Sequence, residues 1–176
     1  MNKGKHVIVE KPMAMSIDDA NLMIETAKKN NVKLSVAHQN RFNKPIQKLR
    51  EAVEEEKLGR IMNGTARILW RRDDNYYKQA PWRGTWDLDG GTLMNQCIHN
   101  IDLMQWMIGS EVERVYAECD TYRNNIEGED FGAILVRFKN GAIGIIEPMH
   151  RGMPPAPSRR SGSRRSVHSL QQHRGS

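Results

Sequence analysis

The sequence predicts an α/β protein in two parts: a short parallel sheet with its crossover helix, followed by an α/β unit with an open, mostly antiparallel sheet. Two observations support this class. Two short β-branched runs flank one amphipathic helix within about 30 residues near the amino terminus, which is the pattern of a βαβ unit. Later, the apolar runs of residues 131–147 meet at an Asn-Gly pair, which is typical of a β-hairpin.

The first part, residues 1–42, has the pattern of strand, helix and strand. Residues 6–10 (HVIVE) form a β-branched run of the kind found in buried parallel strands. Ser16 can cap the helix that follows, and the apolar residues between 20 and 27 share one face. Residues 33–37 (KLSVA) form a second buried strand. In such a unit the ligand site lies beyond the carboxyl ends of the strands.

The second part, residues 43–148, begins with another helix. Asn43 precedes this helix, Pro45 lies in its first turn, and Gly59 is the expected carboxyl-terminal cap. Residues 60–71 then alternate between two faces, as expected of a strand with one solvated side.

A polar, aromatic loop follows this strand. A helix is then predicted to begin at Gly90 and to continue through Asp102, from the spacing of Asn95, His99 and Asp102. Residues 112–122 and 131–147 follow as strands, and Asn140-Gly141 interrupts the second with a two-residue turn. The sequence therefore predicts a mixed or antiparallel sheet with helices on one side.

Residues 149–176 depart from every pattern before them. They are rich in Pro, Ser and Arg and hold few large apolar residues, so we expect them to be disordered. The Ser-Arg-Arg-Ser motifs leave RNA binding open as a minor alternative. A shifted reading frame or a wrongly assigned coding segment explains these residues better, because the change comes abruptly after Glu147, where the sheet should continue.

The net charge of +6 belongs to this tail. Residues 151–176 contain six arginines and no acidic residue, which leaves 21 basic and 21 acidic residues in residues 1–150. A nucleic-acid-binding surface needs a clustered positive excess, so nucleic acid is not an expected partner of the body. Two cysteines are too few for a disulfide framework. No apolar run approaches the roughly 20 residues of a membrane helix, so we expect a cytoplasmic protein with no membrane partner.

Lys11 and His99 are the candidate catalytic residues. Lys11 lies between the first strand and Pro12, so its ammonium is presented from a rigid backbone. His99 is a natural general base near neutral pH. On a helix, Asn95 shares a face with His99 and Asp102 can reach the same side, which suits the binding and deprotonation of a sugar hydroxyl. Taken alone, Lys11 has the competing interpretation of a solvated surface lysine. Taken alone, His99 has the competing interpretation of a core histidine.

No metal site is predicted. Cys97 and His99 lie on different sides of the predicted helix, and no third ligand is spaced to join them. The sequence also contains no G-x-G-x-x-G dinucleotide fingerprint.

The Glu10-Lys11-Pro12 tripeptide and the Gly90-Gly91 helix with Asn95, His99 and Asp102, in this order, together resemble the active site of the glucose-fructose oxidoreductase and inositol dehydrogenase family (Gfo/Idh/MocA). The resemblance implies an NAD(P)-dependent oxidoreductase that transfers hydride between a sugar or nucleotide-sugar hydroxyl carbon and a nicotinamide cofactor. Many members carry aspartate at the position of Asn95, so here Asn95 is expected to bind a substrate hydroxyl rather than to orient the histidine.

The resemblance also implies residue roles. The implied ligands of NAD or NADP, with NAD favoured, are Glu10, Lys11, Pro12, Gln39, Trp82 and Arg83. The implied substrate ligands are Lys11, Arg41, Asn95, His99 and Asp102, of which Lys11 and His99 are catalytic. Residues 37–42 (AHQNRF), 82–86 (WRGTW) and 93–102 (LMNQCIHNID) are most similar to members that oxidise the 3-hydroxyl of UDP-linked N-acetylglucosaminuronic acid. The expected substrate is therefore a small-molecule sugar or UDP-sugar.

The resemblance covers residues 4–148 and begins near the end of the family's dinucleotide-binding domain. Residues 1–42 are then expected to be the carboxyl-terminal remnant of a Rossmann parallel sheet, lacking on the order of 100 preceding residues. Residues 43–148 would be an incomplete substrate-binding and oligomerisation domain. Intact members form homo-oligomers, but we expect the isolated chain to be inactive. The competing interpretation is a truncated, non-catalytic chain or binding module.

Overall fold

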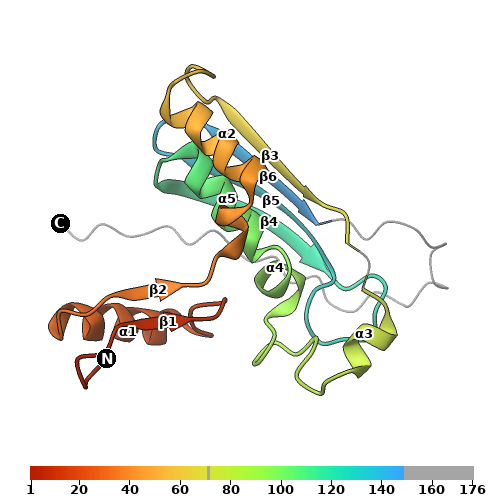
Figure 1. The fold of residues 1–176 in the computed structure, drawn as a ribbon. Coiled ribbons are helices and arrows are strands. Elements are labelled where there is room, and N and C mark those ends of the chain that lie inside the picture. The colour runs from red at the N-terminus through yellow and green to blue at the C-terminus, as the bar shows by residue number, and fades with distance from the viewer. Residues whose placement is uncertain (71, 149–176) are drawn as a thin grey trace, which may run out of the picture.

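The chain begins with a strand, a helix and a second strand that lie apart from a larger sheet (Figure 1). The computed structural model describes residues 1–70 and 72–148. Residues 149–176 lie outside this part of the chain. The expectations of disorder, RNA binding and a shifted reading frame concern those residues. The elements in chain order are β1 (Val7–Val9), α1 (Ile17–Lys29), β2 (Leu34–Val36), the 3-10 helix η1 (Gln39–Phe42), α2 (Lys44–Glu54), β3 (Asn63–Ile68), α3 (Asp74–Lys78), α4 (Gly91–Asn95), α5 (Ile98–Ile108), β4 (Val112–Asp120), β5 (Phe131–Phe138) and β6 (Ile143–Pro148).

Strands β1 and β2 pair in parallel, as predicted, with Val7 opposite Leu34 and Val9 opposite Val36. The Ser16 hydroxyl caps α1 by accepting a hydrogen bond from the Asp19 amide at 3.1 Å. Because parallel strands end at the same edge, the residues after β1 and β2 face the same region of the protein. This edge points toward α4 (Figure 1).

The larger sheet has the strand order β3-β6-β5-β4. β3 and β6 are parallel, whereas β6 pairs with β5, and β5 with β4, in antiparallel fashion, so the prediction of a mostly antiparallel sheet is confirmed. Helix α5 packs on β3 and β6. Glycines permit this close approach, since a Cβ on Gly64 would lie 2.8 Å from the Met104 sulfur. The core cluster consists of Ile68, Cys97, Met104, Ile108, Val136, Phe138, Ala142 and Ile146.

Helix α2 ends five residues before the predicted cap. Glu56 adopts a left-handed conformation with φ of +55°. Its amide bonds to the Val53 carbonyl at 3.1 Å, and the Lys57 amide bonds to the Ala52 carbonyl at 2.9 Å. This pair of bonds is the Schellman arrangement. A glutamate therefore fills the role that the sequence pattern assigned to Gly59.

The single helix predicted from Gly90 through Asp102 is wrong, because the structure has two helices there. The Thr92 carbonyl accepts from the amides of both Gln96 and Cys97, at 2.9 and 3.0 Å, and this shared bond tightens the chain between α4 and α5. The fully buried Cys97 side chain joins the core at the break. Asn95 and His99 therefore lie on different helices.

Candidate active site

Lys11 reaches across the molecule to helix α4. Its Nζ donates to the Asn95 carbonyl oxygen at 2.7 Å and to Asn95 Oδ1 at 3.1 Å. The location follows from the fold, since Lys11 comes two residues after β1 and α4 faces that edge of the parallel pair. An ammonium has three N–H donors, so the described residues leave one donor for a ligand. Partial burial lowers the pKa of Lys11, and the carboxylates of Asp89 and Glu10 oppose that shift.

His99 lies in the first turn of α5 and is buried, with 6% of its surface exposed. Its Nδ1 has no hydrogen-bond partner among the described residues. Burial, followed by the positive charge of Lys11 and the proximity of His38, lowers the pKa of His99. The imidazole is therefore neutral near pH 7 and can accept a proton.

Asp102 is held by Arg41 rather than directed at His99. Arg41 Nε donates to one Asp102 oxygen at 2.7 Å, and a second guanidinium nitrogen pairs with the other oxygen. Arg41 also lies over the Trp106 ring, 5.0 Å from its centroid. Such two-point contacts fix both side chains. The predicted substrate ligands Arg41 and Asp102 are thus brought together, next to the lysine and histidine group.

His38 is a residue of this site that the sequence did not single out. Its ring packs edge-on against His99 with centroids 6.0 Å apart, and its Nδ1 lies 3.7 Å from the Asp102 carboxylate. Its place after β2 could have indicated it, because polar residues at the carboxyl ends of parallel strands line ligand sites.

Asp89 is the second residue that the sequence did not single out. Its side chain is 5% exposed. One carboxylate oxygen accepts from the Gly84 amide at 2.7 Å, and the other accepts from the Asn95 side-chain amide. Asp89 thereby contacts the same asparagine that holds Lys11.

The predicted cofactor ligands fall into two groups. Glu10 and Pro12 flank Lys11 after β1, and the exposed Gln39 begins η1 after β2, so these three residues lie at the ligand edge of the parallel pair. Trp82 and Arg83 lie on the loop before α4 instead. The Arg83 guanidinium stacks on the rings of Tyr76 and Trp82, with its carbon 4.2 and 4.6 Å from their centroids. It lines a separate hollow of about 500 Å³ beside Tyr77 and Glu127.

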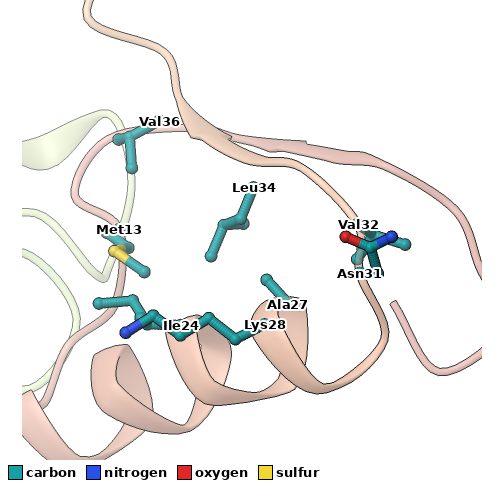
Figure 2. Close-up of a pocket in the computed structure, with 8 residues that line it drawn as sticks. All are labelled: Met13, Ile24, Ala27, Lys28, Asn31, Val32, Leu34 and Val36. Atoms are coloured by element: carbon teal, nitrogen blue, oxygen red, sulfur yellow. The ribbon is translucent and has the colours of Figure 1, made fainter.

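A further hollow lies between α1 and β2, and Figure 2 shows its lining side chains. It measures about 450 Å³ and is mainly apolar. Its lining contains neither Lys11 nor His99, so it does not belong to the candidate active site. Its lining residues are Met13, Ile24, Ala27, Lys28, Asn31, Val32, Leu34 and Val36.

Within residues 1–70 and 72–148, no group of three or more His, Cys, Asp or Glu side chains could hold a metal ion. None of the helices described there is long and apolar enough to cross a membrane. Both cysteines in this part of the chain are free thiols.

Two solved structures with a similar fold are dehydrogenases in complex with NADH and UDP-GlcNAcA. The WlbA dehydrogenase from Chromobacterium violaceum, in complex with NADH and UDP-GlcNAcA, is 41% identical with a TM-score of 0.80, and the match covers 88% of this chain and 44% of that chain. The WlbA dehydrogenase from Bordetella pertussis, with the same two ligands, is 40% identical with a TM-score of 0.80, over 88% of this chain and 48% of that chain.

The sequence comparisons agree. Myo-inositol 2-dehydrogenase from Thermotoga maritima is 30% identical over 155 residues, which are 85% of this chain and 44% of that protein. The chain thus spans less than half the length of these relatives. Residues 1–38 match the family described as "Oxidoreductase family, NAD-binding Rossmann fold", and residues 46–155 match the GFO/IDH/MocA C-terminal domain. With both parts matched in this order, the chain belongs to the Gfo/Idh/MocA family of oxidoreductases.

Proposed function

We propose that this chain is part of an NAD(P)-dependent dehydrogenase that oxidises a hydroxyl of a UDP-linked sugar, with Lys11 and His99 as its catalytic residues. The observation that carries the proposal is that a partly buried amine, bonded to Asn95, lies near enough to a buried imidazole from a distant part of the sequence to lower its pKa. The two WlbA dehydrogenase structures, which hold NADH and UDP-GlcNAcA, support this choice of ligands.

His99 serves as the base in this proposal. Its imidazole is neutral near pH 7 because burial and the Lys11 charge lower its pKa, so it can take the proton of the substrate hydroxyl. Its unpartnered Nδ1 fits a site that a polar ligand completes, because buried polar atoms normally have partners. Asp102, held by Arg41, lies near His38 in the same site.

Lys11 serves as the hydrogen-bond donor to the reacting oxygen. Asn95 accepts two of its three N–H bonds, and the third can bind the oxygen that loses its proton. A positive charge at that point stabilises the developing oxyanion. The positive charge of Lys11 also lowers the pKa of His99. In the site without ligands, a protonated Lys11 therefore favours a neutral His99.

The described residues fit a nicotinamide dinucleotide at the ligand edge of β1 and β2. Glu10 and Gln39 are exposed there, and dinucleotides bind at the carboxyl ends of parallel strands. When bound, the nicotinamide would supply the acceptor for the hydride of the alcohol carbon. Trp82 and Arg83 would contact the cofactor from the loop before α4.

The test puts residues 1–148 in place of the matching part of the Chromobacterium violaceum dehydrogenase, and measures NADH formation with UDP-GlcNAcA by absorbance. We expect H99A to lower kcat by about 10²- to 10⁴-fold while NADH binding, measured by fluorescence, is retained. His6→Gln is the matched control, because His6 is exposed and lies outside the site. Unchanged turnover in H99A would remove His99 from this role, and a chimaera that binds both ligands without forming NADH would contradict the proposal.

A further inference from the structure

Asp89 joins two parts of the candidate active site that are otherwise separate. Its Oδ2 accepts from the Gly84 amide at 2.7 Å, and its Oδ1 accepts from the Nδ2 of Asn95. Asn95 in turn accepts twice from the Lys11 ammonium. One continuous hydrogen-bond path therefore runs from the loop that carries Trp82 and Arg83 to the catalytic lysine.

We propose that Asp89 is a positioning residue for Lys11, which acts by fixing the side-chain amide of Asn95 so that its oxygen faces the ammonium. An asparagine amide can be turned either way, with its oxygen or its NH₂ group toward a neighbour. A carboxylate only accepts hydrogen bonds, so Asp89 draws the NH₂ group of Asn95 to its own side. The Asn95 oxygen is then left for Lys11, which only donates. This inference rests on the proposed function.

The charges around Lys11 support this role. The charged and titratable groups near its ammonium are Glu10 beside it after β1, Asp89 on the loop before α4, and His99 on α5. Burial lowers the pKa of Lys11, and the Asp89 carboxylate is the larger of the two opposing influences. Asp89 thus both directs the ammonium and favours its charged form.

At its other end, the hydrogen-bond path holds Gly84, on the loop that carries Trp82 and Arg83. Gly84 has φ of +76°, and a Cβ there would lie 2.7 Å from Ile126, so only glycine suits this position. Its amide donates directly to the Asp89 carboxylate. By holding that amide, Asp89 couples the position of Arg83 to the position of Lys11.

The first test uses the 176-residue chain without ligands. The titration of Lys11 is followed by NMR of labelled lysine Nζ groups, and its signal is assigned by its loss in K11M. We expect D89N to move the Lys11 midpoint to lower pH, because it removes the charge and turns the Asn95 amide. The side-chain oxygen that D89N retains can still accept from the Gly84 amide, so the loop should stay folded. D87N is the matched control, because Asp87 is exposed on the same loop. An unchanged Lys11 midpoint in D89N would overturn the proposal.

A second variant tests the path through Asn95. N95A keeps Asp89 and its bond to Gly84 but removes the amide between Asp89 and Lys11. We expect N95A to lower the Lys11 midpoint and to reduce the further effect of D89N, as expected for residues that act in series. Equal effects of D89N with and without Asn95 would show that Asp89 acts only as a distant charge, and would overturn the positioning role.

The chimaera separates this inference from the proposed function. There we expect D89N to lower kcat by about 10- to 100-fold and to move the pH profile, with little change in KM for the sugar. D87N should behave as the unmodified chimaera. If H99A abolishes turnover but D89N leaves kcat and the Lys11 titration unchanged, only the role of Asp89 fails. If D89N shifts the Lys11 titration but H99A keeps full turnover, only the proposed function fails.

Discussion

The carboxylate of Glu129 occupies the space that a side chain at position 91 would need. A Cβ built on Gly91 would lie 1.8 Å from Glu129 Oε2. The same side chain accepts from the Leu93 amide at 2.7 Å, and the Glu129 carbonyl accepts from the Thr92 amide at 3.0 Å. The first amides of a helix have no partner within it, so Glu129 anchors the start of α4, the helix that carries Asn95.

Replacing Gly91 by alanine should therefore destabilise the chain strongly. Gly91 has φ of +76°, which costs an alanine about 1 kcal/mol, and the new methyl group would also displace a buried carboxylate from its amide partner. We expect G91A to lower the free energy of unfolding by about 3 kcal/mol or more, measured by urea unfolding followed by circular dichroism.

Gly109 offers a matched control for that measurement. Its φ is +65°, yet a Cβ there would meet nothing within 4 Å, so G109A isolates the backbone strain at about 1 kcal/mol. Similar losses in G91A and G109A would show that Glu129 yields to a side chain at position 91, contrary to its role as an anchor.

Features that depend on neighbouring residues could be predicted from the sequence. The strand patterns, the Ser16 cap and the Asn-Gly turn are of this kind, and the structure contains them. Lys11, Asn95 and His99 could be named as candidates because Lys11 follows a recognisable strand and the other two follow the Gly90-Gly91 pair; their roles stay a prediction.

The partners of those residues could not be predicted in the same way. Glu129 meets Leu93 across 36 positions, and nothing near Glu129 in the sequence marks it as the anchor of α4. Asp89 lies in a loop without periodicity, where a carboxylate normally indicates only solvent exposure. The break after Asn95 depends on the burial of Cys97 in the core, which helical spacing does not reveal. Tertiary contacts decided each of these features.

Glu129 should make the stability of the chain depend on pH. It is 3% exposed, and burial raises its pKa to about 7. The folded chain then holds a proton at pH values where the unfolded chain has released it, so the free energy of unfolding falls as the pH rises from about 4.5 to about 7. The fall attributable to Glu129 is about 3 kcal/mol.

E129Q keeps the oxygen that accepts from Leu93 but cannot ionise. We expect its urea midpoint to change less between pH 5 and pH 8 than that of the unmodified chain, and to be higher at pH 8. Glu113→Gln, at an exposed position of β4, should leave the pH dependence unchanged. If E129Q retains the full fall, another group is responsible.

The two cysteines should differ in reactivity. Cys97 is fully buried, and burial raises its pKa to about 12, so its thiolate is scarce and shielded in the folded chain. Cys119 is only partly buried. Brief alkylation with iodoacetamide at pH 8, followed by peptide mass spectrometry, should label Cys119 before Cys97. Labelling of Cys97 should accelerate in urea. Equal labelling of both thiols in the folded chain would contradict the packing of Cys97.

Removing the charge of Lys11 should raise the pKa of His99. Burial is the largest cause of the lowered pKa of His99, and the positive charge of Lys11 is the next largest. Lys11→Met removes only the effect of the charge. Proton NMR of the imidazole should show the His99 midpoint at higher pH in K11M than in the unmodified chain. Burial should still lower the midpoint in K11M. Lys5→Met, at an exposed position before β1, is the matched control and should leave the midpoint in place. Because the shift depends on proximity alone, it needs neither cofactor nor substrate. A His99 midpoint that K11M does not move would mean that the ammonium and the imidazole do not share a site.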